Sequence, residues 1–149
     1  MGGMQLTRAA DYAVRVMIHM AGLPPDTRVS RNDLAEAADC PDQFLSKVLQ
    51  SLTRAGLVIS HRGNTGGFVL PLSARHTSLL QIVEAVEGPI RLNVCLISAA
   101  ACERQTFCPA HGVWAEAQAA MTGVLRNATI DVLAEQAGAI QLTEGPKWN

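Results

Sequence analysis

The first half of the chain opens with apolar residues at helical spacing. The pattern covers residues 6–21 and stops at Gly22, which two prolines follow. The polar residues Asp11, Arg15 and His19 recur every four positions, so they form one narrow polar stripe on this helix. A helix with so few polar positions is expected to be largely buried.

Two further helices are predicted to follow, joined by a tight turn. Ser30, with Asp33 three residues later, resembles a capping box and predicts a helix that ends at Ala38. Pro41 suits the first position of the next helix, because its missing amide hydrogen is not needed there. Apolar residues continue on one face of that helix until Gly56.

A small β-hairpin is expected directly after these helices. Residues 57–59 and 68–70 are apolar and suit short strands, and the glycine-rich turn 62–67 separates them. A helix, a helix-turn-helix and a hairpin in this order are typical of a winged helix-turn-helix. In that fold the second helix of the helix-turn-helix enters the major groove of DNA. The predicted fold class is therefore mainly α, with a β-hairpin wing.

The second half of the chain predicts helices around an irregular segment. Ser78 with Gln81 is a capping box for one helix, and residues 90–107 then show little periodicity. Pro109 suits the start of a long helix with an apolar stripe. A short helix over 129–137 and a loose tail are expected to complete the chain.

These elements suggest a division into three parts and a dimer. A DNA-binding head is expected over 4–72, an intertwined unit with the irregular loop and the dimerisation helices over 73–137, and a tail over 138–149. A chain of 149 residues has no room for a second core, so the long helix is expected to pack against its counterpart in a homodimer. Two heads related by two-fold symmetry would face a palindromic operator in double-stranded DNA.

Composition and charge narrow the classes of function. The chain is 48% hydrophobic and 17% charged, with a formal charge of −1, which excludes a disordered protein and argues against non-specific coating of nucleic acid. The longest apolar runs, such as 94–101, are far shorter than the roughly 20 residues of a membrane span. No export signal is recognisable at the N-terminus, so a cytoplasmic protein without membrane contact is expected.

The residues predicted to contact DNA lie on the second helix of the helix-turn-helix, in the wing and at the start of the first helix. The helix stripe combines hydrogen-bonding and positive groups without a carboxylate, whereas an ordinary wet face usually mixes both signs of charge. It is expected to face base edges or phosphates, while the wing reaches the backbone or the minor groove. The six candidates are Arg8, Gln43, Ser46, Lys47, Arg62 and Asn64.

Three cysteines form the second candidate site. Cys95, Cys102 and Cys108 lie within fourteen residues, and an odd cluster in a cytosolic protein favours metal binding or redox chemistry over disulfides. Their spacing lacks the Cys-x2-Cys pairs of structural zinc sites and favours an iron-sulfur cluster. A fourth ligand is needed. The candidates are His111, one helical turn beyond Cys108, and Asp11, which a dimer could bring to the opposite subunit's cluster.

The chain resembles the winged-helix iron-sulfur regulators typified by IscR, NsrR and RirA, from residue 4 to about residue 136. The residues that carry the resemblance are Leu6-Thr7-Arg8 with Asp11-Tyr12-Ala13, the segment 52–58, the glycine-rich turn 62–67 and the three cysteines before a long helix. The gap between the first two cysteines is one residue longer than in IscR-like members.

The resemblance implies that Cys95, Cys102 and Cys108 bind a cluster of the 4Fe-4S or 2Fe-2S type. Cys108-x2-His111 resembles IscR, in which a histidine at that place is a ligand. Asp11 matches the carboxylate that some nitric-oxide-sensing NsrR members use, so both fourth ligands stay open.

The expected function is a homodimeric transcription repressor. Its operator affinity would depend on an iron-sulfur cluster that senses nitric oxide, redox state or iron status. The alternatives are a regulator of the same fold that senses thiol oxidation or binds zinc, and a small redox protein. The chain has no phosphate loop, dinucleotide fingerprint, nucleophile elbow or paired catalytic carboxylates, so an enzyme is not expected.

Overall fold

The computed structural model of the protein describes residues 6–98, 100–101, 103–104 and 106–144. Helix α1 (Arg8–Ala21) begins two residues later than predicted, because the Thr7 hydroxyl accepts a hydrogen bond from the amide of Ala10 and caps the helix. The amide of Thr7 donates to Glu87 Oε1 at 2.6 Å, which ties this end of α1 to the end of α4 (Leu79–Glu87).

The helix-turn-helix consists of α2 (Arg31–Ala38) and α3 (Asp42–Arg54). Ser30 caps α2 as predicted, since its hydroxyl accepts from the amide of Asp33 at 3.1 Å. Pro41 is the N-cap of α3 and not its first helical residue, because its ψ of 146° is extended. The predicted start of this helix was therefore wrong by one residue.

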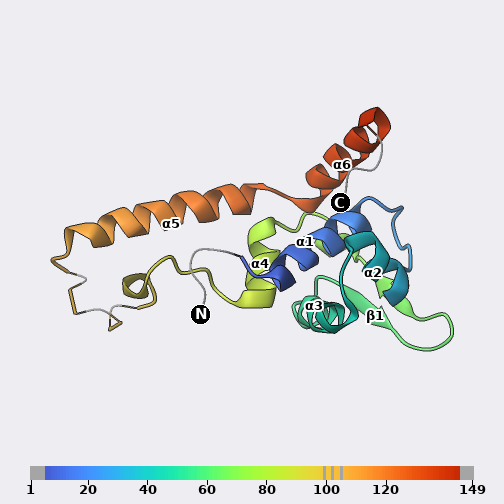
Figure 1. Cartoon of the computed structure of the whole chain (residues 1–149), viewed down its shortest axis with the longest axis horizontal. Coiled ribbons are helices and arrows are strands. Elements are labelled where there is room, and N and C mark those ends of the chain that lie inside the picture. Colours follow the sequence, from blue (N-terminus) through green and yellow to red (C-terminus); the bar gives the residue numbers. More distant parts are fainter. Residues whose placement is uncertain (1–5, 99, 102, 105, 145–149) are drawn as a thin grey trace.

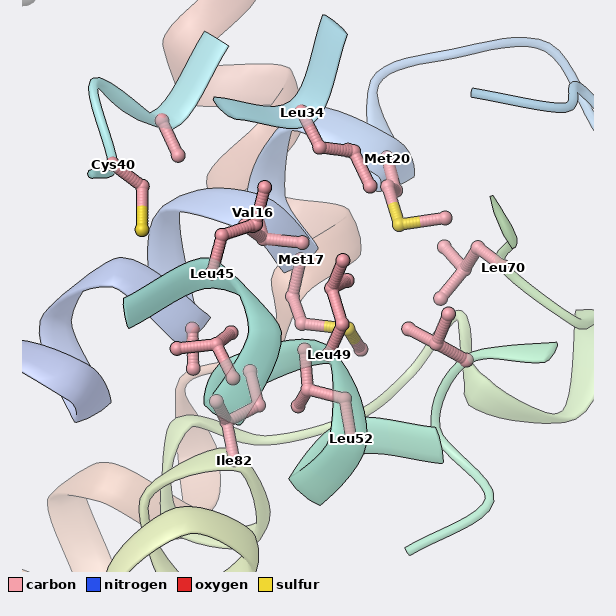
Figure 2. Close-up of a cluster of buried hydrophobic side chains, with 14 of the residues drawn as sticks. Val16, Met17, Met20, Leu34, Cys40, Leu45, Leu49, Leu52, Leu70 and Ile82 are labelled. Carbon is pink, nitrogen blue, oxygen red and sulfur yellow. The ribbon is translucent and has the colours of Figure 1, made fainter. Parts of the chain in front are cut away.

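The hydrophobic core of the head lies between α1, α3 and α4. Figure 2 shows Met17 of α1 among leucines of α3, and Ile82 of α4 lies at the lower edge of the same cluster. Met17, Leu45, Leu52 and Ile82 are completely buried. Burial of one such side chain stabilises the fold by about 1.5–3 kcal/mol, so this contact holds α3 firmly on α1 and leaves its opposite face outside.

The wing is an antiparallel pair of strands, β1 (Ile59–His61) and β2 (Gly67–Val69), in which Ile59 faces Val69. The first strand begins two residues later than predicted, and the second begins one residue earlier. The amide of Leu57 still closes the end of α3 by binding Leu52 O at 3.0 Å, and Val58 is buried in the core.

A third segment pairs with the wing. Val29, in the loop between α1 and α2, exchanges two backbone hydrogen bonds with Phe68 of β2, at 2.9 and 2.8 Å. The hairpin is thereby joined to the start of the helix-turn-helix.

The C-terminal part contains α5 (Pro109–Asn127), which projects from the head and leads the chain back to it, and α6 (Ile130–Glu144), which begins beside the head and contacts α1 (Figure 1). Pro109 occupies the first turn of α5 as predicted. Ile130 is completely buried and packs into the core that α1 contributes to. Helix α6 ends at Glu144 and not at residue 137. Gly138 does not stop it, because a glycine inside a helix costs only about 1 kcal/mol relative to alanine.

The segment between α4 and α5 is mostly irregular, as predicted, apart from the short 3-10 helix η2 (Val94–Leu96). A similar turn, η1 (Leu72–Ala74), connects the wing to α4. Among the residues that the structure describes, no helix is long and apolar enough to cross a membrane.

Candidate DNA-binding and metal-binding sites

The polar face of α3 is exposed along its length. Gln43, Ser46 and Lys47 all face solvent, while Leu45 and Val48 of the same helix are completely buried. This arrangement follows from the helical period, because residues three or four apart share a face. The residues predicted to read DNA are therefore presented outward by a helix whose other face is fixed in the core.

The N-terminal end of this face is held by a residue of α2. Nη2 of Arg31 lies 2.7 Å from Ser46 Oγ and 3.2 Å from Asp42 Oδ1. Arg31 is not among the residues that the sequence pattern predicted to contact DNA. No local signal could have found it, because the contact joins residues that are eleven and fifteen positions apart.

The wing presents the other predicted DNA contacts. Arg62 and Asn64 are exposed in the turn between β1 and β2, and Arg8 is exposed at the first turn of α1. Arg28, from the loop before α2, donates to the carbonyl oxygen of Thr65 and lies 3.3 Å from its hydroxyl. In Figure 1 α3 and the hairpin both lie along the lower edge of the head.

The candidate metal site lies at the start of α5. Cys108 is the N-cap of α5 and is half-buried, and Cys95 is buried in η2, which packs against α5. Leu92, close to η2, donates its amide to Gln118 Oε1 of α5 at 2.8 Å. Cys102 lies outside the described residues. Within the described ranges no group of three metal-binding side chains converges.

His111 has an unsatisfied nitrogen in this region. Its Nδ1 is buried and has no hydrogen-bond partner among the described residues, while its backbone amide donates to Cys108 O at 3.1 Å. A buried ring nitrogen is normally hydrogen-bonded or bound to a metal. His111 therefore fits the role of a ligand beside Cys108.

Asp11 has a partner within its own helix. Its Oδ2 lies 2.9 Å from Nη2 of Arg15, and its side chain is 57% exposed. Arg15 also donates to Ala38 O at the end of α2, at 3.2 Å. The carboxylate of Asp11 is thus satisfied in the single chain, unlike the ring nitrogen of His111.

The remaining described cysteine, Cys40, belongs to the core of the head and not to the candidate metal site. It lies at the turn between α2 and α3, as Figure 2 shows, and its Sγ is 3.5 Å from Pro41 O. Burial raises the pKa of this thiol. A buried, protonated thiol is a poor nucleophile and a poor metal ligand.

Comparisons with known proteins agree with this fold. The model of the family Rrf2, described as iron-dependent transcriptional regulator, matches residues 6–136. A regulator of the HTH type from Mycobacterium tuberculosis is 37% identical over 87 residues, which are 58% of this chain and 54% of that protein. In that match the chain spans only about half the length of its relative.

Two further relatives match over most of their length. IscR of Vibrio vulnificus, an HTH-type transcriptional regulator, is 28% identical over 95% of this chain and 83% of that protein. The crystal structure of CymR from Staphylococcus aureus is similar with a TM-score of 0.67 and 28% identity, over 87% of this chain and 97% of that one. The relatives from M. tuberculosis and V. vulnificus are named as transcriptional regulators, which agrees with the expectation of a regulator and not an enzyme.

Proposed function

Because this chain belongs to the Rrf2 family of transcriptional regulators, we propose that it is a homodimeric repressor whose affinity for a palindromic operator depends on an iron-sulfur cluster. The proposed ligands are Cys95, Cys102 and Cys108 with His111. The cluster would report nitric oxide, redox state or iron status.

The DNA-binding part of the proposal is supported by the exposed face of α3 and by the wing. Gln43 offers an amide that can pair with a base edge, and Lys47 offers a positive charge for a phosphate. Arg62 and Asn64 in the wing, and Arg8 on α1, would add backbone contacts. Neutralisation of phosphates supplies much of the affinity of such proteins, so binding is expected to weaken as salt rises.

The observation that carries the cluster proposal is the buried Nδ1 of His111, one turn beyond Cys108, which has no hydrogen-bond partner among the residues that the structure describes. Cys108 is the N-cap of α5, and η2, which holds the buried Cys95, packs against the same helix. When bound, an iron-sulfur cluster supplies a centre that reacts with oxidants and nitric oxide. Asp11 is the less favoured ligand, since Arg15 already pairs with it.

The dimer is supported by the exposed apolar face of α5. Val113 and Val124 are 62% and 70% exposed, and a separation of eleven residues places them on one face of the helix. None of the residues of α5 is buried. A second copy of α5 is the partner that would cover this face and set the distance between the two heads.

A cluster-free regulator that senses thiol oxidation is the second candidate. CymR of S. aureus, 27% identical over 89% of this chain, has also been solved in an oxidised form. The cysteines of the present chain would then respond to oxidants directly.

The test is anaerobic purification, followed by the visible absorption spectrum and by iron and sulfide analysis. Wild-type protein is expected to be brown and to contain both elements. His111→Ala should lose most of its iron, whereas Asp11→Ala and the control His61→Ala should keep it.

Three other results would change the proposal. If Asp11→Ala loses its iron and His111→Ala keeps it, the carboxylate is the fourth ligand. A colourless protein without iron that binds DNA only when its thiols are reduced would favour the second candidate. Zinc in place of iron would favour the zinc-binding alternative.

A further inference from the structure

The contact between α2 and α3 is made by a side chain that the proposed function does not use. Arg31 is the first residue of α2, and a single nitrogen, Nη2, makes its contacts to α3. It lies 2.7 Å from Ser46 Oγ, 3.2 Å from Asp42 Oδ1 and 3.2 Å from Asp42 O. The Arg31 side chain is only 38% exposed, although it lies on the surface of the head.

This contact determines whether the Ser46 hydroxyl donates or accepts a hydrogen bond when it meets DNA. A guanidinium only donates hydrogen bonds, so the Ser46 oxygen accepts from Arg31 and keeps its own hydrogen to donate. Within the helix, the hydroxyl lies 3.5 Å from Asp42 O, at the outer limit of a hydrogen bond. A base acceptor such as N7 or O6 of guanine, or O4 of thymine, would be a better partner for that hydrogen.

The same contact neutralises the carboxylate on this part of α3. The Asp42 side chain is 81% exposed and is in the first turn of the helix, one turn before Ser46. An unpaired carboxylate there would repel the phosphates that Lys47 is proposed to bind. The positive charge of Arg31 offsets that repulsion.

We propose that Arg31 is a specificity-determining positioning residue, which presets Ser46 as a hydrogen-bond donor toward a base acceptor and shields DNA phosphates from Asp42. This inference rests on the proposed function, in which the polar face of α3 enters the major groove. Arg31, a residue of α2, would thus contribute to the recognition of the DNA sequence by α3.

The experiment is selection from a library of random-sequence DNA duplexes with full-length protein, followed by affinity measurements on the enriched site and its single-base variants. The proteins are wild type, Arg31→Ala, Ser46→Ala and the double variant. Arg91→Ala is the matched control, because it removes the same charge from an exposed position outside the head. Unfolding midpoints verify that each variant is folded.

Ser46→Ala is expected to lose discrimination at one base position of each half-site, by about five- to tenfold, the range of one good polar contact. Arg31→Ala should lose discrimination at the same position, and the double variant should lose no more. Arg31→Ala should also bind all sites more weakly, and adding Asp42→Asn should restore that general affinity without restoring discrimination. Arg91→Ala should keep the wild-type preference.

The inference is overturned if Arg31→Ala keeps the preference that Ser46→Ala loses, if the two variants affect different positions, or if neither changes base preference. These outcomes differ from a failure of the proposed function. In that case the wild-type protein would enrich no sequence and would bind no duplex.

Discussion

At the scale of single residues, burial changes the chemistry of ordinary side chains. His19 belongs to the polar stripe predicted for the first helix, and the structure places its imidazole half-buried on α1. Burial lowers the pKa of His19, although the nearby Asp33 acts in the opposite direction. The neutral ring is therefore favoured in the folded protein.

This shift predicts a pH dependence of stability. Because the folded state resists protonation, the unfolded chain binds the proton first as the pH falls past the ordinary histidine value of about 6.5. The free energy of unfolding should then decrease between pH 7.5 and pH 5.5. His19→Gln should reduce that decrease, as measured by urea unfolding at the two pH values. His61→Gln is the control, and an equal pH dependence in both variants would contradict the prediction.

The candidate metal ligands show how much of a residue's role could be predicted from the sequence. The sequence left two candidates for the fourth ligand, His111 for its spacing from Cys108 and Asp11 as a carboxylate on a largely apolar helix. Their surroundings differ in the folded chain, since Asp11 lies 2.9 Å from Arg15 and Nδ1 of His111 has no partner in the described part of the protein. The roles of Cys95, Cys108 and these two residues stay predictions until iron is measured.

At the scale of elements, the wing needs a glycine at position 67, because the backbone there has a positive φ and lies close to another segment. Gly67 opens β2 with φ of +146°, and a Cβ built there would lie 2.8 Å from Val29 O. That carbonyl belongs to the bridge between Val29 and Phe68. A side chain at this position would push apart the segment that joins the wing to the helix-turn-helix.

Gly67→Ala should destabilise the protein by about 1–3 kcal/mol, because it adds strain at a positive φ and displaces the backbone of Val29. Affinity for operator DNA should fall with it, since the wing would move. Urea unfolding and DNA titration measure the two effects. The control is Gly138→Ala inside α6, where a Cβ meets no atom within 4 Å and where a gain of about 0.5–1 kcal/mol is expected. Unchanged stability of Gly67→Ala would contradict this account of the wing.

At the scale of the whole molecule, α5 is the element that the single chain leaves incomplete. It extends away from the head, and none of its residues is buried, although Val113, Trp114 and Val124 are large and apolar. Val113 and Val124 share one face of the helix, and an exposed apolar face usually marks a protein interface. In the proposed dimer it would set the spacing of the two heads and hence the length of the operator.

Val124→Glu should convert the dimer into single chains, because a carboxylate would be buried without a partner in the proposed interface. Sedimentation equilibrium measures this as a halving of the molecular mass. Leu72→Glu is the control, since it places the same side chain at a 66% exposed position of η1, outside α5. A Val124→Glu protein with the mass of the wild type would exclude this face from the interface.

Local rules were sufficient for much of the fold. Both hydrogen bonds of the capping box between Ser78 and Gln81 are formed, and Pro109 is the first residue of α5, as predicted. Such caps and helix starts are predictable because they depend on residues a few positions apart. The order of the helices and the hairpin follows from patterns of the same range. The end of α6 was missed for a tertiary reason, since Ile130 and Ala134 pack on the core and support a helix that continues past Gly138.

The sequence by itself therefore determined the winged helix-turn-helix, the outward polar face of α3 and the candidate ligands, because hydrophobic period, caps and residue type act over short distances along the chain. The tertiary structure decided which of these groups have partners. Arg31 contacts Ser46, Val29 pairs with Phe68, and Nδ1 of His76 lies 2.8 Å from Oδ2 of Asp131, a contact that no pattern indicated. Each of these contacts joins residues at least fifteen positions apart, and only packing of the elements brings them together.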